Sequence, residues 1–113
     1  EEMNKRELLN TAYGLHCLKK EEKFYQFAKK YLSSNDENTV HDFFDIVEKF
    51  YKKPKKEETR NALGVTGKGS ADDISAWCKL ILTNSSLKQL DKNELAYVMG
   101  YCARIAKIKE IEK

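Results

Sequence analysis

The chain has 113 residues, of which 41% are apolar and 35% are charged, and its net charge is +3. This length predicts one domain with a single core, and this apolar share excludes a disordered polymer. No run approaches the roughly 18 apolar residues of a membrane span, and the start "EEMNKRELLN" lacks the pattern of a secretory signal. We therefore expect one globular domain over residues 1–113, without a membrane partner.

The three cysteines, Cys17, Cys78 and Cys102, are odd in number and widely spaced. A disulfide framework needs an even number, and a zinc site needs paired spacing such as C-x-x-C. The cysteines therefore predict buried free thiols in a reducing, cytoplasmic compartment, and no metal centre.

The N-terminal half predicts three helices. Apolar residues recur at helical spacing from Asn4 to Lys20, and again from Phe24 to Tyr31. The third helix follows an S-x-x-E capping pattern at Ser34 and Glu37. Its apolar face, which we expect to be buried, comprises Val40, Phe43, Phe44, Val47, Phe50 and Tyr51. This helix is expected to end near Lys53, because proline disfavours the helical conformation in the residue before it.

The C-terminal half predicts two further helices and one weak helix before them. Residues 55–63 form a short helix at best, and a glycine-rich hinge occupies residues 64–70. The next helix begins at Ser70 and buries Ile74, Trp77, Cys78 and Ile81. "TNSS" ends that helix, and a D-x-x-E pattern at Asp91 and Glu94 caps the last one. The prediction is an all-α fold, a compact bundle of five to six short helices.

The stretch "LGVTGKGSADDI" has the glycines, lysine and serine of a phosphate-binding loop. A P-loop requires G-x-x-x-x-G-K-[ST] after a buried strand. Here Ala62 stands at the first glycine position and Gly69 at the hydroxyl position. Asp72 and Asp73 in the first helical turn complement the helix dipole and repel phosphate. We therefore expect a hinge and a capped helix start, with no nucleotide cofactor.

The two histidines, His16 and His41, are the remaining candidates for catalysis or metal binding. His16 adjoins Cys17, but neighbouring side chains on a helix point about 100° apart. His41 has Asp42 beside it and Asp45 four residues on, a pattern that suits an exposed helix face as well as a general base. We expect no catalytic residue and no small-molecule substrate.

The segment "EKFYKKPKKEETR" is the strongest candidate for a binding surface. Residues 49–60 hold six basic and two acidic residues. Lysine clusters neutralise phosphates and give affinity that depends on salt and not on sequence. A solvated helix end remains the alternative interpretation. Lys68 on the hinge and two cations on the last helix extend the set if they fold nearby. The residues predicted to contact nucleic-acid backbone are Lys49, Lys52, Lys53, Lys55, Lys56, Arg60, Lys68, Arg104 and Lys107.

The last helix contains "NELAYVMGYCARIAKI", which mixes aliphatic and aromatic residues and then carries an arginine and a lysine. In size, helical class and this loose pattern over residues 93–108, the chain resembles the small helical subunit of CRISPR effector (Cascade-like) complexes. The resemblance implies copies that line up within a complex for antiviral defence and contact nucleic-acid backbone, RNA or DNA, without chemistry.

Two functions remain open. The first is a non-enzymatic helical subunit of a larger nucleoprotein assembly, which contacts nucleic-acid backbone and neighbouring protein subunits. The second is a protein–protein adaptor or regulator without a nucleic-acid role. Such an adaptor would form a homodimer through the small residues Ala96, Gly100 and Ala103 of the last helix.

Overall fold

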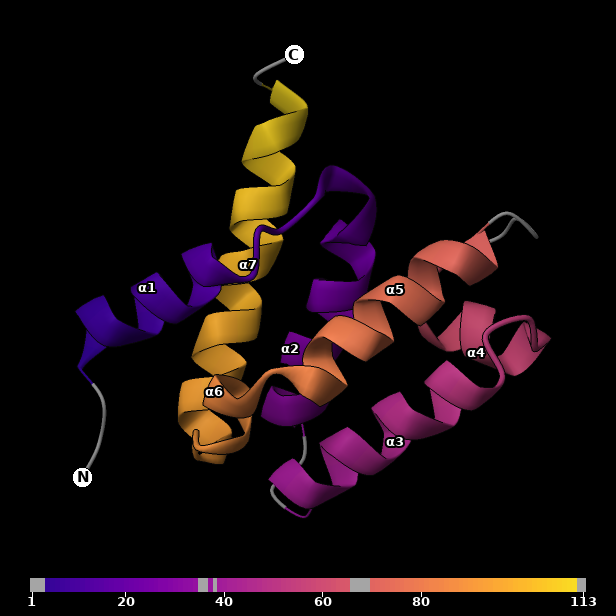
Figure 1. Cartoon of the computed structure of the whole chain (residues 1–113), viewed down its shortest axis with the longest axis horizontal. Coiled ribbons are helices and arrows are strands. Elements are labelled where there is room, and N and C mark those ends of the chain that lie inside the picture. The colour runs from indigo at the N-terminus through magenta and orange to yellow at the C-terminus, as the bar shows by residue number, and fades with distance from the viewer. Residues whose placement is uncertain (1–3, 35–36, 38, 66–69, 112–113) are drawn as a thin grey trace.

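The computed structural model describes residues 4–34, 37, 39–65 and 70–111. It contains seven α-helices and one 3-10 helix in this part of the chain, and no strand occurs there (Figure 1). The all-α prediction is confirmed, but the expected count of five to six helices is wrong. The elements are α1 (Lys5–Gly14), η1 (Lys19–Glu21), α2 (Glu22–Ser34), α3 (Val40–Lys52), α4 (Glu57–Ala62), α5 (Ser70–Thr83), α6 (Ser85–Lys88) and α7 (Lys92–Ile111).

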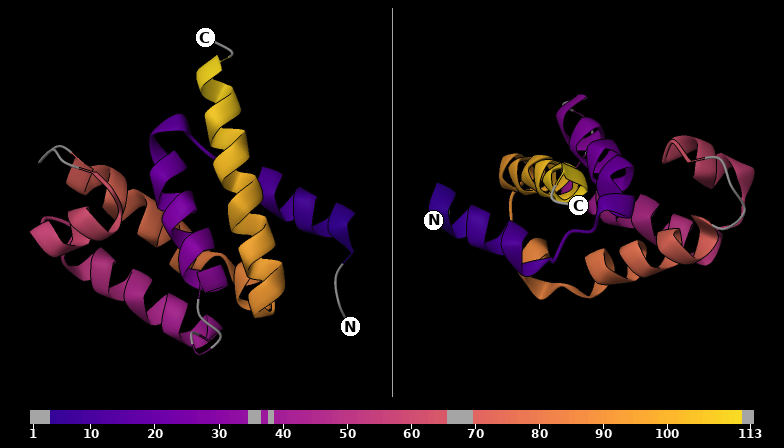
Figure 2. Two further views of the ribbon diagram at one scale, coloured as in Figure 1. Left: turned by 180° about the vertical axis from the view of Figure 1, so that it is seen from behind. Right: turned by 90° about the horizontal axis from the view of Figure 1, so that it is seen from above.

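Two closely packed helix pairs organise the fold. α7 packs against α2 and also against α1, while α3 packs against α5. Figure 2 shows α2 lying beside α7, and in its left view α5 crosses behind α2. The radius of gyration is 13.4 Å, close to the about 13 Å of a compact chain of this length. Buried residues of both pairs belong to one hydrophobic core.

Trp77 on α5 lies at the centre of that core and is fully buried. Its ring lies 5.6 Å from the ring of Phe24 and 5.7 Å from that of Tyr25, both on α2. The contact with Tyr25 is edge-on, a geometry that aromatic pairs favour. These contacts join the α3–α5 pair to the α2–α7 pair. The predicted burial of Ile74, Cys78 and Ile81 beside Trp77 is confirmed.

The first helix is shorter than predicted. α1 ends at Gly14, and His16 then has a φ of 51°, a left-handed conformation that breaks the helix. The reversal brings both Leu15 and Cys17 into the core. Glu21, itself buried, accepts a hydrogen bond from the Leu18 N–H at 3.0 Å and caps η1. The expected helix from Asn4 to Lys20 is therefore wrong, because the chain must turn there for α2 to pack on α7.

The start of the third helix also differs from the prediction. Ser34 is the last residue of α2, and the N-cap of α3 is Thr39. The Thr39 hydroxyl accepts the Asp42 N–H at 3.0 Å, and the Asp42 carboxylate accepts the Thr39 N–H at 3.1 Å. The capping box predicted at Ser34 and Glu37 is thus replaced by one five residues later. The predicted end of the helix is confirmed, because α3 stops at Lys52 with Lys53 as its C-cap.

The last helix begins as predicted. Asp91 accepts the Glu94 N–H at 2.8 Å, and Glu94 accepts the Asp91 N–H at 2.9 Å. The hinge is described only in part: Gly64 adopts a φ of 72°, which favours glycine, and α5 begins at Ser70 with Asp72 and Asp73 in its first turn. Residues 66–69, including Lys68, lie outside the described residues.

Candidate nucleic-acid interface

The predicted basic segment forms one wall of a groove between α3 and α4. The groove has a volume of about 210 Å³, and three of the predicted lysines, Lys49, Lys53 and Lys56, line it. All three are exposed, and its apolar lining includes Ile46, Phe50 and Ala62. Glu58 also lines the groove and reduces its positive charge. An apolar floor with ammonium groups around it suits an anionic polymer whose sugars or bases also contact the protein.

A second groove adjoins the first. It has a volume of about 280 Å³ and lies between α2 and the residues that follow α4. Lys23 and Lys30 line it, and the two grooves share Ala62. The ring of Phe27 in the second groove lies 5.6 Å from the ring of Phe50 in the first. The two grooves therefore form one continuous surface.

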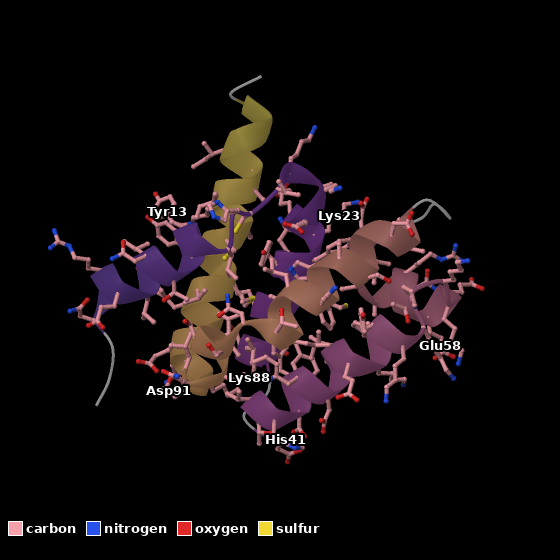
Figure 3. The ribbon with its side chains drawn as sticks, in the orientation of Figure 1. Tyr13, Lys23, His41, Glu58, Lys88 and Asp91 are labelled. Carbon is pink, nitrogen blue, oxygen red and sulfur yellow. The ribbon has the colours of Figure 1, made fainter. Side chains whose placement is uncertain are left out.

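We call this continuous region the basic surface and define it by its five exposed lysines, Lys23, Lys30, Lys49, Lys53 and Lys56. Lys23 is fixed there by a hydrogen bond from its Nζ to the Gly64 carbonyl oxygen at 3.1 Å. Figure 3 shows Lys23 and Glu58 on the side of the molecule away from α1. The sequence did not predict Lys23 or Lys30, because they join this surface only where α2 lies beside the residues that follow α4.

The other predicted residues of the basic segment lie apart from the grooves. Lys52 pairs with Glu48 one turn earlier, with 3.1 Å between Nζ and Oε1. Lys55 is exposed in the turn before α4, and Arg60 on α4 is half-buried. Tyr51 is 41% exposed, although its spacing predicted burial, whereas Phe50 beside it is buried as predicted. The apolar stripe of α3 is therefore buried at Phe50 and exposed at Tyr51.

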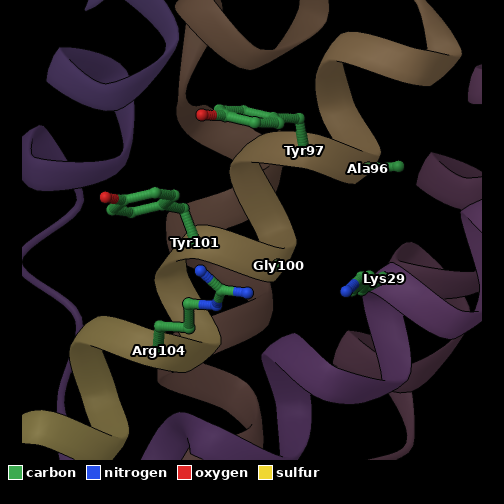
Figure 4. Close-up of a pocket in the computed structure, with 6 residues that line it drawn as sticks. All are labelled: Lys29, Ala96, Tyr97, Gly100, Tyr101 and Arg104. Atoms are coloured by element: carbon green, nitrogen blue, oxygen red, sulfur yellow. The ribbon is translucent and has the colours of Figure 1, made fainter. Parts of the chain in front are cut away.

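The two predicted cations of the last helix lie elsewhere. Arg104 lines a third groove, between α2 and α7, with a volume of about 160 Å³. The residues that line it are Lys29, Ala96, Tyr97, Gly100, Tyr101 and Arg104 (Figure 4). Lys107 is exposed one turn further along α7. α2 therefore separates these cations from α3 and α4, and they do not extend the groove around Lys49.

The cluster around His41 is an exposed structural feature at the start of α3. His41 Nδ1 lies 3.2 Å from Asp45 Oδ2, and Asp42 completes a group whose ligand atoms lie within 4.8 Å of one another. All three residues are exposed, and the Asp42 carboxylate caps α3. Figure 3 shows His41 at the periphery of the molecule. Exposed acidic groups at a helix start occur commonly without a metal, and these residues already have structural partners.

The three cysteines are free and buried, as predicted. The thiols of Cys17 and Cys102 both contact the Ala12 carbonyl oxygen, at 3.8 Å and 3.9 Å. The hydrogen bond with Cys17 and burial raise the pKa of Cys102, and burial raises the pKa of Cys78 to about 12. The thiols of Cys78 and Cys102 are thus protonated at neutral pH, whereas a nucleophilic cysteine needs a lowered pKa.

Comparison with known proteins gives no further guidance. No family model, curated protein or solved structure matches the chain. None of the described helices has both the length and the apolar character that a membrane span requires. The resemblance to CRISPR small subunits stays a prediction, and the function has to be inferred from the surfaces themselves.

Proposed function

We propose that this chain is a non-enzymatic helical module that binds nucleic-acid backbone and acts as a subunit of a larger nucleoprotein assembly. One observation carries the proposal: five exposed lysines from α2, α3 and the turn before α4 surround two adjoining grooves with an apolar floor. Ammonium groups bind phosphates as point charges and release counterions, which favours binding without sequence readout.

The lysines are drawn from separate parts of the chain, which distinguishes this surface from a solvated helix end. Lys23 and Lys30 come from α2, and Lys56 precedes α4. Glu58 is the single acidic side chain among the residues that line the two grooves. A polyanion that follows the grooves would meet positive charge over both.

The test measures affinity for unrelated single strands and duplexes as a function of salt. We expect affinity to fall by orders of magnitude between about 50 mM and about 200 mM salt. The triple variant Lys49→Glu, Lys53→Glu and Lys56→Glu should weaken binding to every sequence and reduce the logarithmic salt slope by about 2 to 3.

A matched control keeps the same change in net charge. Lys5, Lys79 and Lys88 are exposed lysines on α1, α5 and α6 that line neither groove. Figure 3 shows Lys88 well separated from Glu58 on α4. Their triple substitution to Glu should weaken binding much less. No binding at low salt, or equal losses in both triple variants, would contradict the proposal.

The adaptor alternative depended on small residues of α7 being available to a second copy. In the structure, α2 approaches α7 at this stripe, and the side chain of Lys29 lies against Gly100. The stripe thus already has an intramolecular role. A stable oligomer whose mass is independent of salt and nuclease would favour the adaptor function instead.

A further inference from the structure

We propose that the groove between α2 and α7 binds single-stranded nucleic acid, with Tyr97 and Tyr101 stacking on bases and Lys29 and Arg104 binding the flanking phosphates. This inference rests on the proposed function and adds a preference for single strands. The residues that carry it lie in a groove distinct from the basic surface.

The two tyrosines form an aromatic platform. They lie one turn apart on α7, with ring centroids 5.9 Å apart and an angle of 32° between the ring planes. Both side chains are half-buried, so each is held by the protein and still reaches solvent. Figure 4 shows both rings projecting from the same side of α7. Aromatic rings held in this way stack on any unpaired base, since every base has a π face.

Two cations lie beside the platform. Figure 4 shows the guanidinium group of Arg104 next to Gly100, with the ring of Tyr101 on one side of it and Lys29 on the other. Lys29 belongs to α2, and its side chain follows the surface of α7 so closely that Nζ would lie 3.5 Å from a Cβ at residue 100. The groove contains no acidic residue among those that line it. This charge fits an anionic ligand.

The shape of the groove favours a strand over a small molecule. Its volume is about 160 Å³, whereas pockets for small molecules span about 300 to 1,000 Å³. A space of this size holds one group of a longer ligand that continues over the surface. Paired bases of a duplex are stacked on each other and do not present a free face, so the tyrosines favour single strands.

The test compares a single strand and a duplex of the same sequence with variants of the platform. Tyr97→Leu with Tyr101→Leu keeps apolar packing but removes the π faces, whereas Tyr97→Phe with Tyr101→Phe keeps them. The Leu variant should lose at least about fivefold in affinity for the single strand and change little for the duplex. The Phe variant should bind like the original chain.

A second variant covers the case in which the Leu variant does not fold. Lys29 and Arg104 are exposed, so Lys29→Glu with Arg104→Glu preserves the core. It should weaken single-strand binding more than duplex binding. Equal losses for both ligands, or no loss for the single strand, would overturn this inference.

These outcomes are separable from those of the basic surface. If the Lys49, Lys53 and Lys56 variant weakens binding while the platform variants do not, the proposed function stands and this groove has no part in it. If only the platform variants weaken binding, the groove binds the strand and the basic surface does not. A chain that binds neither ligand at low salt refutes both.

Discussion

The Lys29 side chain on α2 occupies the space that a Cβ at residue 100 of α7 would need. A Cβ there would lie 2.9 Å from Lys29 Cδ, closer than real Cβ contacts allow, and a tight 3.2 Å from Lys29 Cε. Gly100 therefore lets the aliphatic part of Lys29 lie directly on α7 and places its ammonium group in the groove beside Arg104. Because Gly100 has no side chain, it determines where the ammonium group of Lys29 lies on the surface of α7.

Substitution of Gly100 by alanine should separate stability from binding. Alanine is favoured over glycine inside a helix by up to about 1 kcal/mol, and the atoms it displaces belong to a flexible side chain. We expect the free energy of unfolding to stay equal or to rise, while single-strand affinity falls about two- to fivefold because Lys29 moves. Chemical denaturation and a binding titration measure the two effects.

Two other glycines serve as controls for this change. Gly14, the last residue of α1, has open space where its Cβ would lie, so Gly14→Ala should leave affinity unchanged. Gly64 has a φ of 72°, so Gly64→Ala should destabilise the fold by about 1 kcal/mol. If Gly100→Ala were as destabilising as Gly64→Ala, the Lys29 contact would be more rigid than proposed.

The cap of α3 can be tested against the cap that the sequence suggested. Thr39→Ala removes the acceptor for the Asp42 N–H and should reduce the free energy of unfolding by about 0.5 to 2 kcal/mol. Ser34→Ala, at the exposed end of α2, should change it by less than about 0.5 kcal/mol. Urea denaturation distinguishes the two, and the reverse order would restore the cap at Ser34.

Adjacent aromatic residues at the end of α3 should differ strongly in their contribution to stability. Phe50 is 5% exposed and packs against Phe27, whereas Tyr51 is 41% exposed. Phe50→Ala should cost about 3 to 5 kcal/mol, and Tyr51→Ala under about 1 kcal/mol. Thermal denaturation monitored by circular dichroism measures both. Similar losses would mean that Tyr51 is buried as the sequence pattern predicted.

The free energy of unfolding should decrease at alkaline pH because buried thiol and phenol groups are protonated in the folded chain. The thiol of Cys78 has an ordinary pKa of 9.0, and burial raises it to about 12 in the folded chain. Above pH 9 the unfolded chain loses this proton while the folded chain keeps it, so the folded state is destabilised as pH rises. The loss is about 1.4 kcal/mol per pH unit for each such group until the folded pKa is reached.

Cys102 and Tyr25 should also reduce the free energy of unfolding as the pH rises. The hydrogen bond with Cys17 and burial raise the pKa of Cys102, and burial raises that of Tyr25. Below pH 9 these contributions to stability are fully present. Urea denaturation between pH 7 and pH 10 measures the loss, and in the variant Cys78→Ala the slope above pH 9 should be smaller by about one proton. A slope unchanged by that substitution would show that Cys78 titrates normally.

The binding surfaces were predictable only in part. Lys49, Lys53 and Lys56 were found because they lie within one short segment, which is a signal that a sequence carries. Lys23, Lys29 and Lys30 belong to an ordinary amphipathic helix, and nothing in their spacing indicates that α2 presents them to two different grooves. Tyr97, Tyr101 and Arg104 follow one another at helical spacing on α7, so their grouping can be read from the sequence. Lys29 joins them only when α2 packs on α7.

The sequence by itself determined the helical class, the main apolar stripes, the cap at Asp91 and the end of α3 before Pro54, because these depend on residues within a few positions of one another. It did not determine where α1 ends or which residue caps α3. His16 adopts a left-handed conformation, and Leu15 and Cys17 are both buried, because the chain reverses direction to place α2 against α7. The free energy of burial in the common core outweighs the local preference for a longer helix, and that balance exists only in the tertiary structure.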